Sequence, residues 1–361
     1  MSRTFHIALL PGDGIGPDVT AEAVRALRAT EQIVADLRLE FVEFSIGAGE
    51  YLRSGDPLPE SVFRRLPEFD AILLGAMGLP GVRWPDGVEM TPQLDLRERL
   101  DLYQGLRPIY LFHPEDSVLR GRQAGDIDLV IVRESTEGLF SGRKSKRDPA
   151  ADRATDTMLI TRAASERVIR AAFQLAQSRR GRVALVDKAN VLPSMAFFRQ
   201  VFDEVACEFP GVQTDRVYVD AAALFLVRQP EMFDVIVTEN MFGDILSDLA
   251  AGLVGGMGMA PSADIGDRYA VFQPSHGSAP DIAGRGIANP VATILSAAML
   301  LDWLNTPAAR RGAQRIQRAV RDVLSDRRAR TRDMGGTLST AQMGDAIIAS
   351  LRRTADMELP Q

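Results

Sequence analysis

The sequence contains one cysteine and three histidines. A single cysteine rules out an intrachain disulfide and a metal site built from cysteines, and it suits a reducing compartment, so we expect a cytoplasmic protein. Cys207 lies at helical spacing in VFDEVACEF, where we expect a buried thiol with a structural role. Among the histidines only His276 belongs to a motif, which argues against a histidine-rich zinc site.

Long apolar runs and blocks of positive charge are also missing. No run of about 18 apolar residues is present to span a membrane, and the first residues, MSRTFHIALLPGDG, have no long apolar signal region. The formal net charge is −6, and the 42 Lys and Arg residues are spread along the chain. We therefore expect neither a membrane nor a nucleic-acid partner.

What the sequence does contain is an alternation of strand and helix patterns. Apolar and β-branched runs predict strands at 5–10, 41–46, 71–75, 127–135, 182–189, 215–221 and 233–240. Apolar periodicity predicts helices at about 17–37, 94–102, 161–179, 192–208, 289–304 and 307–330, and a last helix that opens with a capping box of Ser339 and Gln342. The alternation is typical of an α/β fold with an at least partly parallel sheet, and 361 residues favour two domains. The polar segment 141–157 has no period and predicts an exposed arm that reaches a partner subunit.

The segment TENMFGDILSDLAAGL, 238–253, follows a β-branched run and predicts an amphipathic helix. Asp244 and Asp248 lie one turn apart on it, so their carboxylates project from the same face. Two carboxylates at the carboxyl end of a strand suit a hard divalent cation such as magnesium. Two acids on a solvated face have the same spacing, but Gly243 and its apolar neighbours favour a helix packed close to other backbone.

A glycine-rich turn, Gly12-Asp13-Gly14-Ile15-Gly16, follows the first strand and opens a helix. Its spacing is G-x-G-x-G with a proline after it, whereas the Rossmann fingerprint is G-x-G-x-x-G. The turn is therefore a weak sign of a nucleotide site, and a plain tight connection between strand and helix is the other interpretation.

Three arginines form a candidate site for an acidic ligand. Arg97 and Arg107 lie in LDLRERLDLYQGLRPI, and Arg133 ends a predicted strand in IVRESTEG. A planar guanidinium can bind a carboxylate through two charge-assisted hydrogen bonds, each contributing roughly 1.5–3 kcal/mol. The alternative is that Arg97 and Arg107 form surface ion pairs with neighbours such as Asp95 and Glu98.

Two further motifs could carry chemistry. Lys188, in VDKANV, follows a hydrophobic strand, where α/β sheets place ligands, and partial burial would suit it to base chemistry; an exposed lysine is the alternative. The loop HGSAPDIAGRGIANP, 276–290, could wrap a nucleotide, with backbone N–H groups on phosphate and Asp281 accepting from a ribose hydroxyl. A structural turn is the alternative for the loop.

Taken together and in this order, GDGIGPDV, DKANVL, NMFGDILSD and HGSAPDIAGRGIANP resemble the β-decarboxylating dehydrogenases, which include isopropylmalate, isocitrate, homoisocitrate, tartrate and D-malate dehydrogenases. The resemblance covers most of the chain. It implies an α/β fold of the isopropylmalate dehydrogenase type, which is not a Rossmann fold, with two domains and a mixed sheet flanked by helices. Residues 1–102 and 257–361 would form a nucleotide-binding domain, and 103–256 a middle domain with the dimerisation arm and the metal-binding helix.

The resemblance also implies a homodimer with shared active sites, and it assigns roles to particular residues. The substrate would be bound by Gln93, Leu94, Arg97, Arg107, Arg133, Asn190 and Val191. The implied catalytic residues are Lys188 and Asp220. The metal, Mg²⁺ or Mn²⁺, would be bound by Asp244 and Asp248 of one subunit and Asp220 of the other, which would also supply Lys188 and Asn190. NAD would be bound by His276, Gly277, Ser278, Ala279, Asp281 and Asn289.

Elementary chemistry agrees with these roles. A metal chelated by an alcohol and its neighbouring carboxylate acidifies the hydroxyl, and Lys188 can take the proton while hydride leaves for nicotinamide. The β-keto acid then loses carbon dioxide because the metal stabilises the enolate. Asp281 matches members that use NAD, whereas NADP-using members carry Lys-Tyr at 281–282, and an acid there would repel a 2′-phosphate.

Phe140, in STEGLF, departs from the family pattern, since members usually carry a tyrosine there that is thought to protonate the enol. General acid catalysis is typically worth about 10²–10⁴-fold. Our hypothesis is that water, Lys188 or another tyrosine replaces the missing donor, and we expect Tyr218 to share a strand face with Asp220.

Gln93 is the second departure, because isopropylmalate enzymes resemble Leu-Leu-x-Leu-Arg where this chain has Gln93-Leu94-Asp95-Leu96-Arg97. The side-group pocket is therefore more polar, although Met90, Leu94 and Val191 keep it partly apolar. A buried unpaired amide would cost about 1–3 kcal/mol, which favours a substrate with a hydroxyl or carboxylate at this point.

Three functions follow from these features. The first is NAD- and metal-dependent oxidative decarboxylation of a 2-hydroxy diacid of the 3-isopropylmalate type. The second is the same chemistry on tartrate or D-malate. The third is a regulatory subunit that binds substrate and nucleotide without turnover; the phenylalanine at 140 favours it, and the retained lysine, arginines and metal-binding aspartates count against it.

Overall fold

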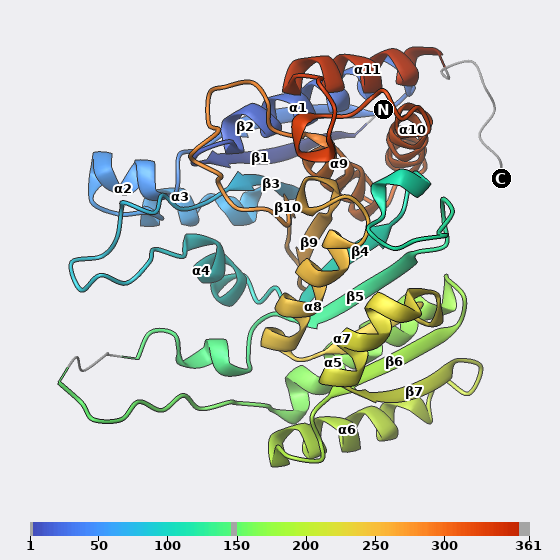
Figure 1. The fold of residues 1–361 in the computed structure, drawn as a ribbon. Coiled ribbons are helices and arrows are strands. Elements are labelled where there is room, and N and C mark those ends of the chain that lie inside the picture. The colour runs from blue at the N-terminus through green and yellow to red at the C-terminus, as the bar shows by residue number, and fades with distance from the viewer. Residues whose placement is uncertain (1–2, 146–149, 354–361) are drawn as a thin grey trace.

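A ten-stranded mixed sheet runs through the whole molecule in the computed structural model, which describes residues 3–145 and 150–353. The strand order is β2-β1-β3-β10-β9-β4-β5-β8-β6-β7, with helices on both faces (Figure 1). Strands β10, β9, β4 and β5 pair antiparallel in the middle, and the strands outside this group pair parallel. The predicted α/β fold with a mixed sheet flanked by helices is confirmed.

One half of the sheet is built from the two ends of the chain. Its strands are β1 (Thr4–Gly12), β2 (Arg38–Glu43), β3 (Ala71–Ala76), β9 (Pro261–Ile265) and β10 (Ala270–Pro274). Two helices, α1 (Gly16–Ile33) and α9 (Val291–Trp303), pack against it, and α10 (Pro307–Leu324) and α11 (Thr340–Arg353) pack on these two helices in the same apolar core. Three shorter helices complete this half: α2 (Ala48–Ser54), α3 (Glu60–Phe63) and α4 (Pro92–Arg99). Leu96 of α4 packs with Leu10 and Leu74 on the opposite face of the strands.

The middle of the chain builds the other half. Its strands are β4 (Gln104–Tyr110), β5 (Asp128–Glu134), β6 (Arg182–Asp187), β7 (Gln213–Tyr218) and β8 (Val235–Thr238). The helices are α5 (Arg162–Gln177), α6 (Pro193–Ala206), α7 (Val219–Arg228) and α8 (Asn240–Gly252). Because side chains alternate along β5, Leu129 and Ile131 pack with α7 and α8, whereas Val130 and Val132 pack with α5 and α6. The two helix pairs therefore cover opposite faces.

One local prediction is confirmed, and two are corrected. Ser339 and Gln342 form the capping box: the Gln342 N–H donates to Ser339 Oγ at 3.1 Å, and the Ser339 N–H donates to Gln342 Oε1 at 2.8 Å. The helix expected to reach residue 330 ends at Leu324. The strand expected at 215–221 ends at Tyr218, so Asp220 lies in the first turn of α7 and does not share a strand face with Tyr218.

Three expectations from composition have different outcomes. Cys207 is exposed, so the prediction of a buried thiol is wrong: it follows α6, whose buried face is carried by other residues. In the expected arm, 150–157 are exposed and without helix or strand, while 146–149 lie outside the described residues. No helix in residues 3–145 and 150–353 is both long enough and apolar enough to cross a membrane.

Candidate functional site

A cavity of about 170 Å³ lies where the two halves of the sheet meet. It collects residues that are far apart in the sequence: Gln93, Arg97, Arg107, Arg133, Asp244, Asp248, His276 and Gly277 are all in its lining. The structure therefore brings together the predicted arginines, both aspartates of the metal motif and the start of the predicted nucleotide loop.

The three arginines are buried and come from three elements. Arg97 lies on α4, Arg107 on β4 and Arg133 on β5, and their residues are 7%, 4% and 2% exposed. The alternative of surface ion pairs is wrong, because Asp95 and Glu98 pair instead with Arg143 and Lys144 at the base of the arm.

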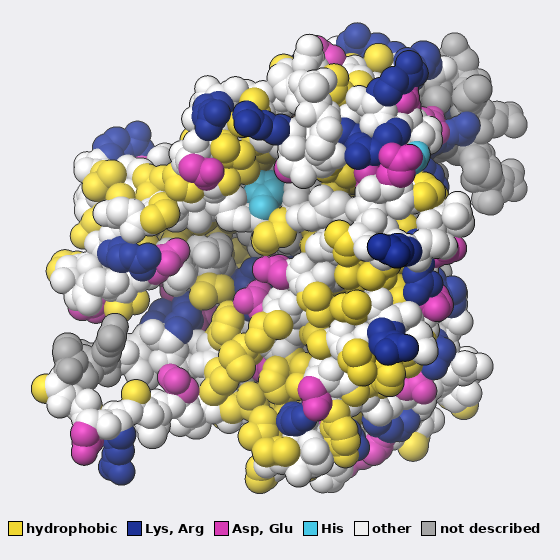
Figure 2. All heavy atoms as spheres, in the orientation of Figure 1, with side chains coloured by type: hydrophobic (Ala, Val, Ile, Leu, Met, Phe, Trp, Pro, Cys, Tyr) yellow, Lys and Arg dark blue, Asp and Glu magenta, His cyan; other side chains and the backbone are white. Residues whose placement is uncertain are grey.

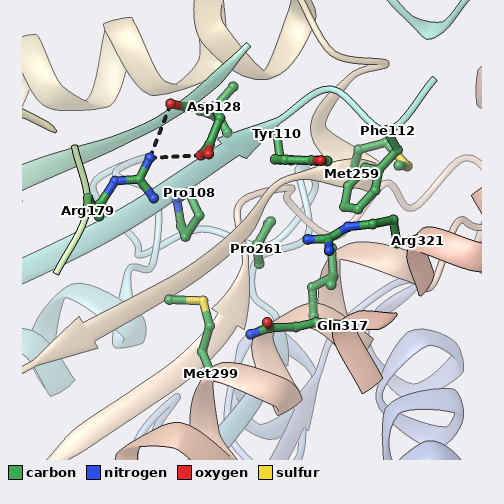
Figure 3. Close-up of a pocket in the computed structure, with 12 residues that line it drawn as sticks. Pro108, Tyr110, Phe112, Asp128, Arg179, Met259, Pro261, Met299, Gln317 and Arg321 are labelled. Atoms are coloured by element: carbon green, nitrogen blue, oxygen red, sulfur yellow. Dashed lines mark hydrogen bonds and ion pairs between the residues drawn. The ribbon is translucent and has the colours of Figure 1, made fainter. Parts of the chain in front are cut away.

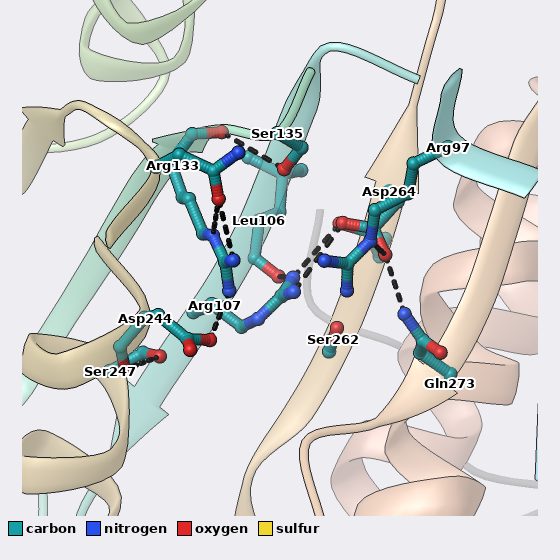
Figure 4. A network of polar contacts seen from close by, with 12 residues as sticks. Arg97, Leu106, Arg107, Arg133, Ser135, Asp244, Ser247, Ser262, Asp264 and Gln273 are labelled. Carbon is teal, nitrogen blue, oxygen red and sulfur yellow. Dashed lines mark hydrogen bonds and ion pairs between the residues drawn. The ribbon is translucent and has the colours of Figure 1, made fainter. Parts of the chain in front are cut away.

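Asp264 is a member of the site that sequence reasoning missed. It lies on β9, and it accepts hydrogen bonds from Arg97 Nε at 2.9 Å and from an Arg107 terminal nitrogen at 3.4 Å (Figure 4). Gln273, on the adjacent strand β10, donates to the same carboxylate. Burial alone would raise the pKa of Asp264, but the positive charge of Arg97, Arg107 and Arg133 outweighs it and holds that pKa below its usual range.

Arg133 is tied to the start of α8. Its Nε donates to Asn240 Oδ1 at 2.9 Å, and one terminal nitrogen donates to Asp244. Gly243 permits this approach, because a Cβ atom there would meet the Arg133 side chain at 2.7 Å. The expectation that this helix packs closely around Gly243 is therefore confirmed. Burial, with added repulsion from Arg97, lowers the pKa of the Arg133 guanidinium to about 10, so it stays charged at neutral pH.

Asp244 and Asp248 present two carboxylates to the same cavity, as the helical spacing predicts. Burial and the charge of Asp244 raise the pKa of Asp248, so a positive ion between them would relieve repulsion. In the described part of the chain, no group of three acidic, histidine or cysteine side chains is close enough to hold a metal ion. The two aspartates fit a divalent cation whose remaining ligands come from elsewhere.

Lys188 and Asp220 meet each other, but neither lines this cavity. Lys188 follows β6, and its Nζ donates to Asp220 Oδ1 at 2.7 Å. That hydrogen bond lowers the pKa of the Asp220 carboxyl. Asn190 and Val191 are exposed beside them, and the ring of Tyr218 lies 5.8 Å from Lys188 Nζ. The pair sits on the surface of its own chain.

The predicted nucleotide loop borders a second cavity of about 410 Å³. His276 and Asn289 line it together with Ile15, Ile282 and Asp333, while Asp281 is exposed at the adjoining turn. Among the described residues nothing bonds to the buried Nε2 of His276, and burial lowers the pKa of this ring. An unpaired ring nitrogen in a cavity of this size fits a bound nucleotide that supplies its partner.

The glycine-rich turn supports this loop. Gly12 and Gly14 adopt φ values of 75° and 60°, and the Ile15 N–H donates to the carbonyl of Ser278 at 2.8 Å. A Cβ atom on Gly14 would lie 1.9 Å from that carbonyl oxygen. Asp13 accepts three backbone N–H groups, from Ala48, Gly49 and Gly78. The turn is thus a tight connection that packs against the nucleotide loop, in agreement with the second interpretation of its sequence.

Gln93 lines the arginine cavity, and Phe140 contacts one of its arginines. The Oε1 atom of Gln93 is buried, and no described residue donates to it. The Arg133 guanidinium carbon lies 5.2 Å from the centre of the Phe140 ring. Gln93 therefore offers an unused acceptor, while Phe140 offers only its aromatic ring.

A further cavity, of about 210 Å³, lies on the opposite face of the sheet between β4 and helices α9 and α10 (Figure 3). Its polar side chains are already engaged: Arg179 pairs with Asp128 and Asp234, and Arg321 lies over the ring of Tyr110 at 5.2 Å. It therefore lacks the unpaired groups that mark the arginine cavity.

Comparisons with known proteins agree with this geometry. The family model described as isocitrate/isopropylmalate dehydrogenase matches residues 6–347. The chain is 44% identical to a 3-isopropylmalate dehydrogenase of Albidiferax ferrireducens, over 96% of this chain and 100% of that protein. It is 45% identical to a 3-isopropylmalate dehydrogenase of Corynebacterium efficiens, over 96% of this chain and 99% of that one.

Solved structures give the same result for the fold. An isocitrate dehydrogenase from Methylococcus capsulatus superposes with a TM-score of 0.86 at 39% identity, covering 96% of this chain and 99% of that chain. A β-decarboxylating dehydrogenase from Thermococcus kodakarensis superposes with a TM-score of 0.80 at 39% identity, covering 98% of each chain.

Proposed function

The chain belongs to the isocitrate/isopropylmalate dehydrogenase family, and from this premise we propose that it catalyses NAD- and divalent-metal-dependent oxidative decarboxylation of a 2-hydroxy diacid of the 3-isopropylmalate type. The family makes it a β-decarboxylating dehydrogenase that acts on a CH–OH group. The observation that carries the finer proposal is the cavity in which Arg97, Arg107 and Arg133 face Asp244 and Asp248.

The arginines are proposed to bind the substrate carboxylates. Arg97 and Arg107 both donate to Asp264, while Arg133 donates to Asp244. The cavity therefore has two positive regions. A diacid can use both, one carboxylate in each region, with its hydroxyl towards the aspartates. Their burial strengthens each charge-assisted hydrogen bond because little water competes there.

Asp244 and Asp248 are proposed to hold Mg²⁺ or Mn²⁺, with Asp220 of a second subunit completing the site. When bound, the metal supplies Lewis acidity towards the substrate hydroxyl and the neighbouring carboxylate. Lys188 of the second subunit is proposed to accept the hydroxyl proton at Nζ, and Asp220 keeps that amine in place through their 2.7 Å hydrogen bond. Asn190 and Val191, exposed next to Lys188, are proposed to contact the substrate from the same side.

An exposed apolar surface supports the homodimer that this sharing requires. Leu224 and Val227 on α7 and Ile245 on α8 are 53%, 42% and 59% exposed, and apolar side chains gather over these two helices (Figure 2). Val191, 64% exposed, lies next to Lys188. A second copy seated on this surface would cover the apolar residues and would bring Lys188 and Asp220 to a neighbouring site. The two-fold arrangement also accounts for a metal site with only two local ligands.

NAD is proposed to occupy the second cavity, bound by His276, Gly277, Ser278, Ala279, Asp281 and Asn289. The unpaired Nε2 of His276 and the Asn289 side chain, which donates to Asp333 at 3.1 Å, support this assignment. The carboxylate of Asp281 suits a ribose hydroxyl and disfavours a 2′-phosphate. We also propose that 1–102 with 257–361 and 103–256 act as two domains, with the substrate cavity between them.

Tartrate or D-malate is the second candidate substrate, and Gln93 favours it. A buried Oε1 without a donor costs about 1–3 kcal/mol, and an isopropyl group would leave it unpaired. The second hydroxyl of tartrate would pair with it, whereas D-malate has only hydrogen at that carbon and would leave Oε1 to water. The identity to 3-isopropylmalate dehydrogenases favours the first candidate.

Steady-state NADH formation by the purified protein tests the proposal. The panel is 3-isopropylmalate, tartrate, D-malate, isocitrate and homoisocitrate with NAD and Mn²⁺ or Mg²⁺, and carbon dioxide is followed in parallel. We expect turnover of 3-isopropylmalate, or of tartrate or D-malate if Gln93 dominates. Absence of turnover with every acid, although NAD binds, would contradict the proposed function and support a regulatory subunit.

A further inference from the structure

Asp264 lies behind the arginine cavity and does not line it. Its residue is 1% exposed, on β9, between the arginine of α4 and the arginine of β4. It accepts from Arg97, Arg107 and Gln273, and these three donors come from three different elements. No role in ligand contact is open to a carboxylate enclosed in this way, so its function has to pass through its donors.

We propose that Asp264 is a positioning residue: it turns Arg97 and Arg107 towards the substrate carboxylate and limits the positive charge that the pair presents to other anions. The proposal rests on the proposed function, because it takes these arginines as carboxylate ligands.

The contacts of Arg97 carry the positioning part. Among the described residues, Asp264 alone accepts from Arg97, and it does so at Nε. The two terminal nitrogens, which form the fork that binds a carboxylate, are left for a ligand. Arg107 is held differently, because it also donates to the carbonyls of Leu106 and Ala263 at 2.9 and 3.2 Å. Loss of Asp264 would therefore release Arg97 more than Arg107.

The charges of the cluster carry the second part. Arg97, Arg107 and Arg133 repel one another, and each disfavours the charge of a neighbour within the buried site. Asp264 is the carboxylate that two of them share. Gln273 fixes that carboxylate through a neutral amide and adds no charge of its own. Without Asp264, the excess positive charge would attract any small anion, and orientation towards a bidentate carboxylate would be lost.

Two opposite effects are therefore expected from Asp264→Asn, an isosteric change that removes the charge. The KM for the accepted diacid should rise about tenfold or more, from loss of an oriented charge-assisted contact, while kcat changes less. The inhibition constant of inorganic sulfate should fall severalfold, because the neutral variant leaves more positive charge unbalanced. Sulfate affinity can also be followed by the rise it causes in the unfolding temperature, which needs no turnover.

Three further variants make the test specific. Asp264→Ser offers a smaller neutral acceptor and should change both constants in the same directions, should the asparagine variant fold poorly. Asp264→Asn combined with Gln273→Glu moves the carboxylate to the adjacent strand and should return sulfate affinity towards that of the original protein. Asp267→Asn removes an acid outside the cavity, where Asp267 accepts from the Tyr103 hydroxyl at 3.1 Å, and should alter neither constant.

The outcomes separate this inference from the proposed function. If substrate and sulfate both bind more weakly to the Asp264 variants, Asp264 only maintains the fold, and the proposal is overturned. If neither changes, it is overturned as well. If the original protein turns over none of the acids, the proposed function fails, but sulfate affinity still decides whether Asp264 limits the charge of the pair.

Discussion

Two buried arginines of this protein, Arg330 and Arg97, differ in how many of their N–H groups are bonded within the chain. Arg330 is fully buried and donates five hydrogen bonds, two to the carboxylate of Asp116 at 2.9 and 2.7 Å and three to backbone carbonyls. Arg97 donates one, to Asp264, among the described residues. A guanidinium has five N–H donors, so Arg330 is saturated by its own chain and Arg97 is not.

This difference distinguishes an arginine that is buried to stabilise the fold from one that is buried to bind a ligand. Arg330 joins the segment after α10 to the loop after β4, and its charge is matched by a single buried acid. Arg97 shares its acid with Arg107 and faces a cavity that also contains Arg133. Unused donors and unmatched positive charge are costly to bury, and those of Arg97 lie where a dicarboxylate is proposed to bind. The comparison leads to four predictions, from the largest expected effect to the smallest.

Removal of the divalent cation should affect only the cavity that contains the three arginines with Asp244 and Asp248. With EDTA, or with Asp248→Asn, NADH formation should fall by about 10³-fold or more, because metal Lewis acidity is worth several kcal/mol. The decrease in the free energy of unfolding that Arg330→Met causes, measured by urea unfolding, should be the same with and without the cation. Mixing Asp248→Asn with Lys188→Met subunits should restore part of the activity if two subunits share each site; no recovery on mixing would refute the sharing.

Breaking the pair of Arg330 and Asp116 should have the reverse effect, lowering stability and leaving substrate binding unchanged. Arg330→Met leaves Asp116 buried without a partner, which should lower the free energy of unfolding by about 3–5 kcal/mol, while KM stays the same. Urea unfolding and steady-state kinetics measure both quantities. The double variant Arg330→Met with Asp116→Leu should recover much of the stability. A large rise in KM for either variant would mean that the pair is not purely structural.

Gln93→Leu should change the selectivity between 3-isopropylmalate and tartrate by about tenfold. Leucine removes the unpaired Oε1 and adds an apolar contact, each worth roughly 1–2 kcal/mol. The ratio of kcat/KM for 3-isopropylmalate to kcat/KM for tartrate should therefore rise. Gln93→Glu, which keeps a polar group, serves as the matched control and should not raise it. An unchanged ratio in Gln93→Leu would show that the side group does not reach residue 93.

Phe140→Tyr should have the smallest effect, a severalfold increase in kcat for the accepted diacid. The ring already lies over Arg133, so a hydroxyl there would supply a general acid near the reacting carbon. Steady-state NADH formation gives kcat, and Phe140→Leu is the control that adds no proton donor. No change in Phe140→Tyr would show that water, Lys188 or Tyr218 already suffices.

The candidate site was predictable where residues carry a motif, and not where they act through contacts. Arg97, Arg107, Asp244 and Asp248 stand in recognisable segments, and all four reach one cavity. Asp264 stands in PSADIGD, which has no pattern of its own, and its contact with Arg97 spans 167 residues. Only the pairing of β9 with β4 brings it into place.

The fold shows the same limit. Long periodic helices and buried parallel strands were predicted, but β4, β9 and β10 were not. Gly105 and Pro108 interrupt β4, Pro261 begins β9 and Pro274 ends β10, and these residues weaken a strand pattern. The apolar start of α7 was interpreted as the end of a strand, since a short apolar run does not distinguish the two. Both errors fall where tertiary pairing decides the local structure.

Binding of the diacid to Arg97→Met and to Arg330→Met, measured by isothermal titration in the presence of Mn²⁺, tests the central comparison most directly. The ligands are 3-isopropylmalate, tartrate and D-malate. We predict that Arg97→Met raises the Kd of the accepted acid about 100-fold, the value of a bidentate charge-assisted contact, with unchanged stability, while Arg330→Met leaves that Kd unchanged. Equal affinity of the original protein and Arg97→Met for the diacid would contradict the proposal that the arginine cavity binds the substrate.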